Sequence, residues 1–101
     1  MGKVVWLQRE FGVFEMDGKW NDIPGVYVFA GVNASDKWHA IYVGQASSFA
    51  QRMSAHERWV EARREGATHV HAHVCRQQTE RDNLEKALIQ SYGPPLNSHY
   101  A

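Results

Sequence analysis

The sequence contains little cysteine and no long apolar segment. Cys75 is the single cysteine among 101 residues, so no internal disulfide can form, and a cysteine-rich zinc finger is excluded. Such a chain is typical of a reducing compartment, and we expect it to be cytoplasmic. No apolar run approaches the roughly 20 residues of a membrane-spanning helix, and no signal-peptide core follows the first basic residue. We therefore expect no membrane partner and a single domain over residues 1–101.

The sequence also lacks an excess of either charge. Eleven Lys and Arg balance eleven Asp and Glu, which gives a net charge of zero and a pI near 7.0. A nucleic-acid-binding domain that acts alone usually has a pI above about 9. Any binding of phosphate must therefore depend on a local cluster of basic residues, on the six histidines or on a second subunit.

Two β-branched and aromatic segments, residues 25–30 and 39–44, are separated by a turn-rich stretch. This pattern predicts an antiparallel hairpin with a long loop. A symmetric loop would place Tyr27 directly opposite Tyr42, with Cβ atoms about 5 Å apart on one face of the sheet.

A capping box predicts a helix after this hairpin. Ser48 is the expected N-cap and Gln51 the third helical residue, and the helix should run to about Arg64. Arg52 and His56 are four residues apart, so we expect them to be neighbours on the surface of this helix.

A third strand is predicted at residues 69–75, where apolar residues alternate with His69, His71 and His73. The apolar residues should face the core. The three histidines on the other face have a spacing that could bind zinc. Histidines at alternate positions of a strand more often simply face solvent.

A second helix is predicted over residues 80–92, with Thr79 as its N-cap and Gly93 as its stop. Near the N-terminus, Asp17-Gly18 suggests a tight hairpin turn, so residues 1–22 are expected to add a hairpin or an edge strand. Together the patterns predict an α/β protein of the α+β type: a small, mainly antiparallel three-stranded sheet flanked by helices.

Glu85 lies inside the apolar arc of the second helix, together with Leu84 and Leu88. Burying an unpaired carboxylate costs several kcal/mol, so the side chain must be ion-paired, protonated or bound to a metal. A buried ion pair with an arginine such as Arg52 is the plain structural interpretation.

Six short motifs occur in one order along residues 23–97: Gly25-Val26-Tyr27, Tyr42-Val43-Gly44, Arg52, His56, Glu85 and Asn97. In this order they resemble the GIY-YIG nuclease family, with valine replacing isoleucine in both motifs that name it. The two tyrosines are 15 positions apart, which is longer than is usual in the family. The first 22 residues lie outside the resemblance.

The resemblance implies a metal-dependent DNA endonuclease in which water attacks a phosphodiester bond with the help of one metal ion. Glu85 would hold Mg²⁺ or Mn²⁺, as a hard oxygen ligand. Arg52 would bind phosphate, and Tyr27 would act as general base or orient the water. Tyr42 would contact the nucleophile or the phosphate, and His56 would relay the proton taken by Tyr27.

Three further residues of the motifs would support this site. Gly44 allows close approach of the backbone or ends its strand, Asn97 fixes the segment after the second helix, and Gly25 supports the first strand. The expected partner is DNA, branched or damaged, bound with the help of a homodimer or an accessory protein.

Each of these residues also has an alternative interpretation in which it only stabilises the fold. Arg52 would form a surface ion pair with Glu57, and the two tyrosines would simply pack across the hairpin. The corresponding function is a catalytically weak or inactive domain that binds DNA or another protein.

Overall fold

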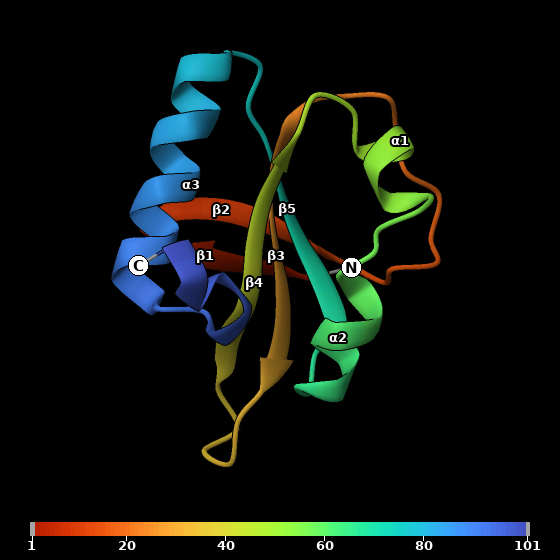
Figure 1. The fold of residues 1–101 in the computed structure, drawn as a ribbon. Coiled ribbons are helices and arrows are strands. Elements are labelled where there is room, and N and C mark those ends of the chain that lie inside the picture. The colour runs from red at the N-terminus through yellow and green to blue at the C-terminus, as the bar shows by residue number, and fades with distance from the viewer. Residues whose placement is uncertain (1, 101) are drawn as a thin grey trace.

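The computed structural model describes residues 2–100, with side chains described for residues 2–97. A curled sheet forms its centre, and three helices cover the two faces (Figure 1). In chain order the elements are β1 (Lys3–Trp6), β2 (Arg9–Phe14), β3 (Gly25–Val32), β4 (Trp38–Ala46), α1 (Phe49–Met53), α2 (Trp59–Arg64), β5 (His69–Val74), α3 (Gln78–Tyr92) and the 3-10 helix η1 (Pro95–Tyr100).

The sheet has the strand order β1-β2-β5-β3-β4, and every neighbouring pair is antiparallel. The predicted α+β class and antiparallel sheet are confirmed, but the predicted count of three strands is wrong. The sheet has five strands because the N-terminal residues form a hairpin whose second strand pairs with β5, with Gly12 opposite Ala72.

The N-terminal hairpin turns at a different place from the predicted one. Its two strands are joined by Leu7 and Gln8, which both have positive φ angles, of 50° and 65°, as a tight two-residue hairpin turn requires. Asp17-Gly18 forms a separate turn, in which the Gly18 amide donates to the Glu15 carbonyl at 3.2 Å, and residues 19–24 after it form no strand.

The predicted direct pairing of the two tyrosines is wrong. Tyr27 lies opposite Gly44, and Phe29 lies opposite Tyr42. A shift in register between Phe29 and Ala30 makes the hairpin asymmetric, which a symmetric loop does not anticipate. Tyr27 and Tyr42 nevertheless share a face of the sheet, with ring centroids 6.4 Å apart.

The predicted long helix is broken into α1 and α2. Ser48 is the N-cap, as predicted, and its hydroxyl accepts from the Gln51 amide at 3.2 Å. The helix then stops because the Ser54 hydroxyl donates to the Gln51 carbonyl at 2.8 Å, and residues 54–58 are not helical. Arg52 and His56 are therefore not neighbours on one helix.

Helix α3 ends as predicted and begins differently. Gly93 closes it in the left-handed conformation, at φ 54°. The N-cap is Gln77 instead of Thr79. The buried Arg81 explains the earlier start, because its Nη1 donates to the carbonyls of Cys75 and Arg76 at 3.1 and 3.0 Å and ties the first turn to the end of β5.

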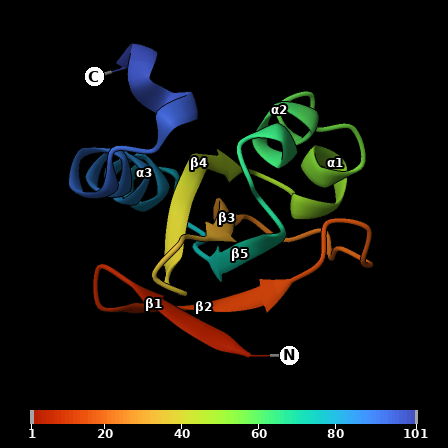
Figure 2. The ribbon, with the colours of Figure 1, turned by 90° about the horizontal axis from the view of Figure 1, so that it is seen from below.

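Helix α3 packs on one face of the sheet, and α1 and α2 pack on the other (Figure 2). The curled N-terminal hairpin covers part of β5. The expectation that the histidine side of β5 is exposed to solvent is therefore wrong for the central histidine. His71 is fully buried, and its Nδ1 accepts from Trp6 Nε1 at 3.0 Å. The flanking His73 donates instead to the carbonyl of Glu10 at 2.9 Å.

The three histidines of β5 thus have separate partners. No group of three or more His, Cys, Asp or Glu side chains within the described part of the chain is arranged to hold a metal. None of the helices in that part is long and apolar enough to span a bilayer.

Candidate active site

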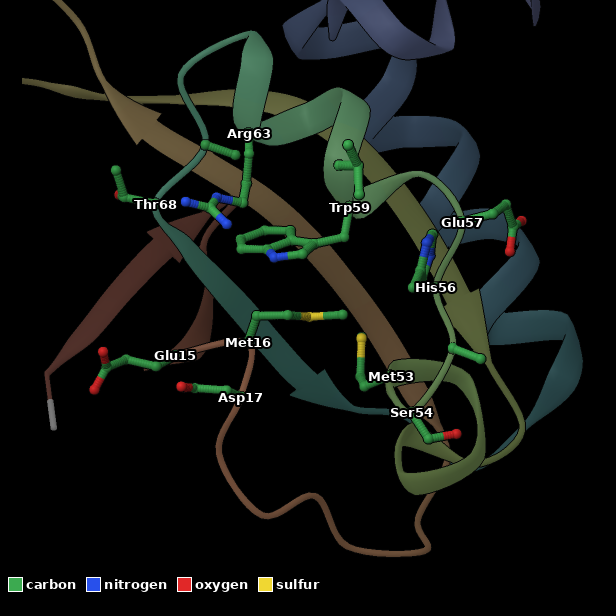
Figure 3. A pocket seen from close by; sticks show the side chains of 13 residues that line it. Glu15, Met16, Asp17, Met53, Ser54, His56, Glu57, Trp59, Arg63 and Thr68 are labelled. Atoms are coloured by element: carbon green, nitrogen blue, oxygen red, sulfur yellow. The ribbon is translucent and has the colours of Figure 1, made fainter.

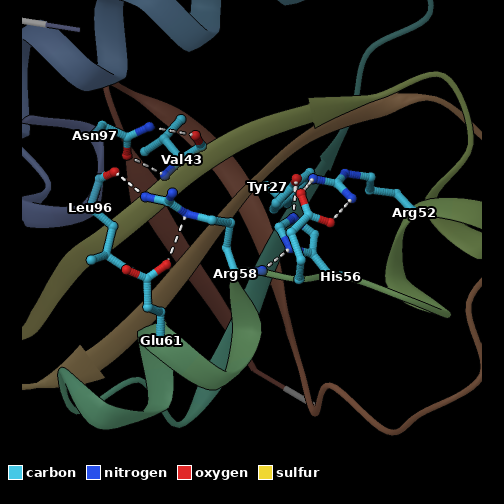
Figure 4. A network of polar contacts seen from close by, with 9 residues as sticks. Tyr27, Val43, Arg52, His56, Arg58, Glu61, Leu96 and Asn97 are labelled. Carbon is cyan, nitrogen blue, oxygen red and sulfur yellow. Dashed lines mark hydrogen bonds and ion pairs between the residues drawn. The ribbon is translucent and has the colours of Figure 1, made fainter. Parts of the chain in front are cut away.

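Tyr27 and His56 form a buried pair at the centre of the site. The Tyr27 hydroxyl and His56 Nε2 lie 2.6 Å apart, and both side chains are buried. Tyr27 comes from the middle of β3, whereas His56 comes from the non-helical link between α1 and α2 (Figure 4). The break in the predicted helix is what turns His56 toward the sheet.

Gly44 makes room for this tyrosine. It lies opposite Tyr27 in the sheet, and a Cβ atom built on it would overlap the Tyr27 hydroxyl and ring. A glycine is therefore needed here so that the phenol can lie flat across β4.

The hydrogen bonds of His56 decide which ring nitrogen carries its proton. Nδ1 accepts from the backbone N–H of Arg58 at 3.1 Å. A neutral imidazole has one N–H, so the proton lies on Nε2, which donates to the oxygen of Tyr27. His56 consequently has no free site for the proton of Tyr27, which argues against the expected proton relay.

The environment keeps both groups neutral near pH 7. Burial raises the pKa of Tyr27 well above its ordinary value, and Tyr42 raises it further, whereas the charge of Arg52 only partly opposes this. Burial also lowers the pKa of His56 to about 4, with a further contribution from Arg52. The charge of Arg52 alone therefore does not make Tyr27 acidic, because the loss of hydration is the larger effect.

Arg52 lies beside this pair and is held by a carboxylate. Its Nη1 and Nη2 donate to the two oxygens of Glu57 at 3.0 and 2.9 Å. The ion pair with Glu57 anticipated from the sequence is therefore present. Arg52 remains next to Tyr27, and its charge partly offsets the rise in the pKa of Tyr27 that burial causes.

Arg58 is a neighbour of the site that the sequence motifs did not reveal. Its guanidinium carbon lies 5.3 Å from the centre of the Tyr42 ring, and its Nη2 donates to the carbonyl of Leu96 at 2.7 Å (Figure 4). Arg58 thus joins α2 to β4 and to the segment after α3. No spacing rule would have found it, because its partners are distant in sequence.

Glu85 is half-buried on α3 and is not paired with an arginine. Its Oε1 accepts from Gln45 Nε2 at 3.1 Å, and it makes no ion pair with any residue whose side chain the structure describes. The plain interpretation of a buried pair with Arg52 is wrong. Burial raises the pKa of Glu85, an effect that the Gln45 hydrogen bond partly offsets.

Gln45 was also missed by the sequence analysis, although it directly follows Gly44. Its amide nitrogen donates to Asp82 at 2.6 Å as well as to Glu85, and its amide oxygen accepts from Gln78 at 2.9 Å. This network fixes α3 against the end of β4 and orients the Glu85 carboxylate.

The fold matches known structures, although no family model and no curated protein matches the sequence. The GIY-YIG N-terminal endonuclease domain of UvrC from Thermotoga maritima, bound to its catalytic divalent cation magnesium, superposes with a TM-score of 0.60 at 26% identity. The match covers 74% of this chain and 83% of that one. This chain carries a GIY-YIG domain.

A tyrosine-to-phenylalanine mutant of the same Thermotoga maritima domain, bound to its catalytic divalent cation, gives a TM-score of 0.58 at 28% identity. Here the match covers 74% of this chain and 82% of the other. The GIY-YIG domain of this chain therefore has the fold that the sequence motifs implied.

The remaining motif residues of the GIY-YIG domain support its backbone. Asn97 is buried, and its side chain accepts from the Val43 amide at 2.8 Å and donates to the Val43 carbonyl at 3.0 Å. A Cβ atom on Gly25 would overlap the His73 carbonyl and the Phe49 ring. Both residues hold the strands that carry the tyrosines.

Glu85 is suited to a divalent cation. It offers a half-buried carboxylate that makes no ion pair with a described side chain, and burial raises its pKa because its charge loses hydration there. A single carboxylate fits Mg²⁺, which usually keeps several of its waters.

An open groove of about 800 Å³ adjoins the site on the side of α2. Trp59 lies across it, facing Met16 and Met53, while His56 and Glu57 lie at the end nearest the site (Figure 3). The groove therefore leaves solvent-filled space beside Glu57.

Proposed function

We propose that this GIY-YIG domain is a divalent-metal-dependent DNA endonuclease that hydrolyses a phosphodiester bond by attack of water. The observation that carries the proposal is the group formed by the buried Tyr27–His56 pair, Arg52 and the unpaired Glu85 on a fold similar to a magnesium-bound endonuclease domain. We assign the catalytic core to residues 23–97 and an added hairpin to residues 1–22.

Tyr27 is proposed to orient the attacking water and, as phenolate, to accept its proton. His56 donates its Nε2–H to the same oxygen, which favours the phenolate form and fixes the direction of the ring. His56 is thus assigned a positioning role in place of a proton relay.

Arg52 is proposed to bind the phosphodiester, because its planar, permanently charged guanidinium can donate to two phosphate oxygens. Tyr42 contacts the phosphate or the water from the neighbouring strand. Glu85 holds Mg²⁺ or Mn²⁺, which when bound acts as a Lewis acid on the leaving oxygen.

The test uses plasmid and branched DNA with Mg²⁺ or Mn²⁺ and compares two variants on one helix. Glu85→Gln removes the proposed metal ligand and should lower cleavage by a factor on the order of 100 or more. Glu80→Gln is the matched control, since Glu80 is an exposed carboxylate in the first turn of the same helix, away from the Gln45 network; it should retain most activity. Equal cleavage by wild type and Glu85→Gln would refute the metal assignment.

A second function, binding of DNA without cleavage, is favoured by one observation. Both terminal nitrogens of Arg52 are already engaged by Glu57, so the edge that would hold the scissile phosphate is occupied. Retention of DNA at low salt, with no cleavage across several divalent metals, would support this alternative.

A further inference from the structure

The contact between Arg52 and Glu57 joins two side chains of different exposure. The Arg52 side chain is 32% exposed, and that of Glu57 is 68% exposed. A carboxylate presents two oxygens to the end of the guanidinium, in the same way as two phosphate oxygens do. Glu57 therefore occupies positions that a phosphodiester would take at the Nη1–Nη2 edge of Arg52.

The residues on both sides of Glu57 are anchored, whereas among the described residues its own carboxylate is held only by Arg52 and by the backbone N–H of Glu57 itself. His56 is hydrogen-bonded to Tyr27, and Arg58 is bonded to the Leu96 carbonyl. Rotation of the Glu57 side chain can thus release Arg52 without moving His56 or Arg58. The Glu57 side chain is mostly exposed, so the released carboxylate can turn into solvent.

The charges favour competition at this position. With Glu57 attached, the pair has no net charge and attracts phosphate weakly. Once Glu57 has left, the guanidinium carries an uncompensated positive charge next to Tyr27. Because the chain has no net charge, the uncompensated charge of Arg52 contributes a large part of the electrostatic attraction between the protein and DNA.

We propose that Glu57 is a gating residue of the site, whose carboxylate holds Arg52 until a phosphodiester displaces it. The proposal rests on the proposed function, because it treats Arg52 as the phosphate ligand. In this role Glu57 lowers the affinity for the substrate. A residue that merely positions Arg52 would raise that affinity.

Mild acid does not open this contact. The hydrogen bonds from Arg52 lower the pKa of Glu57 to about 2, so its carboxylate stays ionised at any pH at which the protein would be assayed. Displacement by another anion, or substitution of Glu57, is what frees Arg52.

The experiment measures the affinity of the full chain for a short DNA duplex in EDTA at low salt, and KM and kcat with Mg²⁺ or Mn²⁺. Glu57→Gln should bind DNA about three- to fivefold more tightly and lower KM by a similar factor, since exposed ion pairs are worth about this much. The value of kcat should change by less than twofold.

Glu61→Gln is the matched control. It removes one negative charge four residues away, from an ion pair with Arg58 at 3.4 Å, and should change affinity by less than twofold. The gain from Glu57→Gln should also disappear in an Arg52→Gln background, because the competition is for Arg52.

The proposal would be overturned by weaker or unchanged binding by Glu57→Gln, by an equal gain with Glu61→Gln, or by a gain that persists without Arg52. Absence of DNA binding by every variant would also overturn it. If no variant cleaves DNA but Glu57→Gln alone binds more tightly, the gating role stands and the proposed nuclease activity fails.

Discussion

At the residue scale, the chemistry of the site depends on a phenol that burial keeps protonated. Tyr27 lies almost without solvent contact, and its raised pKa follows mainly from that burial. His56 offers it a hydrogen bond but no site for its proton. The fraction of phenolate therefore increases with pH over the whole range in which the protein is assayed.

We predict that the rate of cleavage rises with pH from 7 to 9, by up to about tenfold per unit. No inflection is expected near pH 6.5, because His56 has a pKa of about 4. The measurement is kcat/KM against pH at constant ionic strength and saturating metal.

Tyr27→Phe is the control for this pH dependence. It removes the hydroxyl and should lower the rate by roughly 100-fold or more, while leaving a flatter profile. A wild-type rate that is constant from pH 7 to 9 would contradict the role assigned to the phenolate.

At the scale of elements, short segments that connect helices and strands hold the functional residues. The link between α1 and α2 carries His56, Glu57 and Arg58, and the segment after α3 carries Asn97. Asn97 is tied to both backbone groups of Val43 in β4, the strand that also holds Tyr42.

We predict that Asn97→Ala lowers the free energy of unfolding by about 2–4 kcal/mol. The substitution leaves the buried N–H and C=O of Val43 without partners, and each orphaned group costs about 1–3 kcal/mol. Urea denaturation followed by circular dichroism measures the change.

Asn33→Ala is a matched control for this loss. Asn33 also makes two side-chain hydrogen bonds to backbone, with the amides of Ser35 and Lys37 at 2.9 and 3.1 Å, but in an exposed turn. Water replaces its bonds, so the loss should stay below about 1 kcal/mol. Equal losses at the two positions would show that burial of the Val43 groups is not the cause.

At the scale of the whole molecule, the N-terminal hairpin closes a histidine into the core. His71 accepts from Trp6, and its Nε2 has no hydrogen-bond partner among the described residues. The ring centroids of Trp38 and His71 lie 4.6 Å apart, with the two rings nearly perpendicular. Burial lowers the pKa of His71 to about 4, so two histidines of the folded protein, His56 and His71, resist protonation.

We predict that stability falls as the pH is lowered from about 6.5 to 4. In this window the unfolded chain, with histidine pKa values near 6.5, binds protons that the folded chain does not bind, so acid favours unfolding. Urea denaturation between pH 7 and 4.5 measures the dependence.

His71→Phe should make this dependence smaller, although it lowers stability at every pH because Trp6 loses its acceptor. Glu57 acts in a lower range, between its ordinary value and about 2, and so does not obscure the result. An unchanged slope in His71→Phe would contradict the role of His71.

Local patterns were sufficient for much of the fold. Strands β3, β4 and β5, the Ser48 cap and the Gly93 stop follow from alternation and capping, which depend on near neighbours in the sequence. The predicted long helix is broken although the helical pattern continues, because the Ser54 hydroxyl bonds the Gln51 carbonyl and His56 pairs with Tyr27 in β3.

The sequence by itself determined which chemical groups this domain contains and their order along the chain: two tyrosines, an arginine, a histidine and one carboxylate on the apolar side of a helix. Only the tertiary structure decided their states and partners. Burial raises the pKa of Tyr27, and the break between α1 and α2 places His56 next to Tyr27. Glu57 occupies both terminal nitrogens of Arg52. These effects depend on hydration and on contacts between distant segments, which no local spacing encodes.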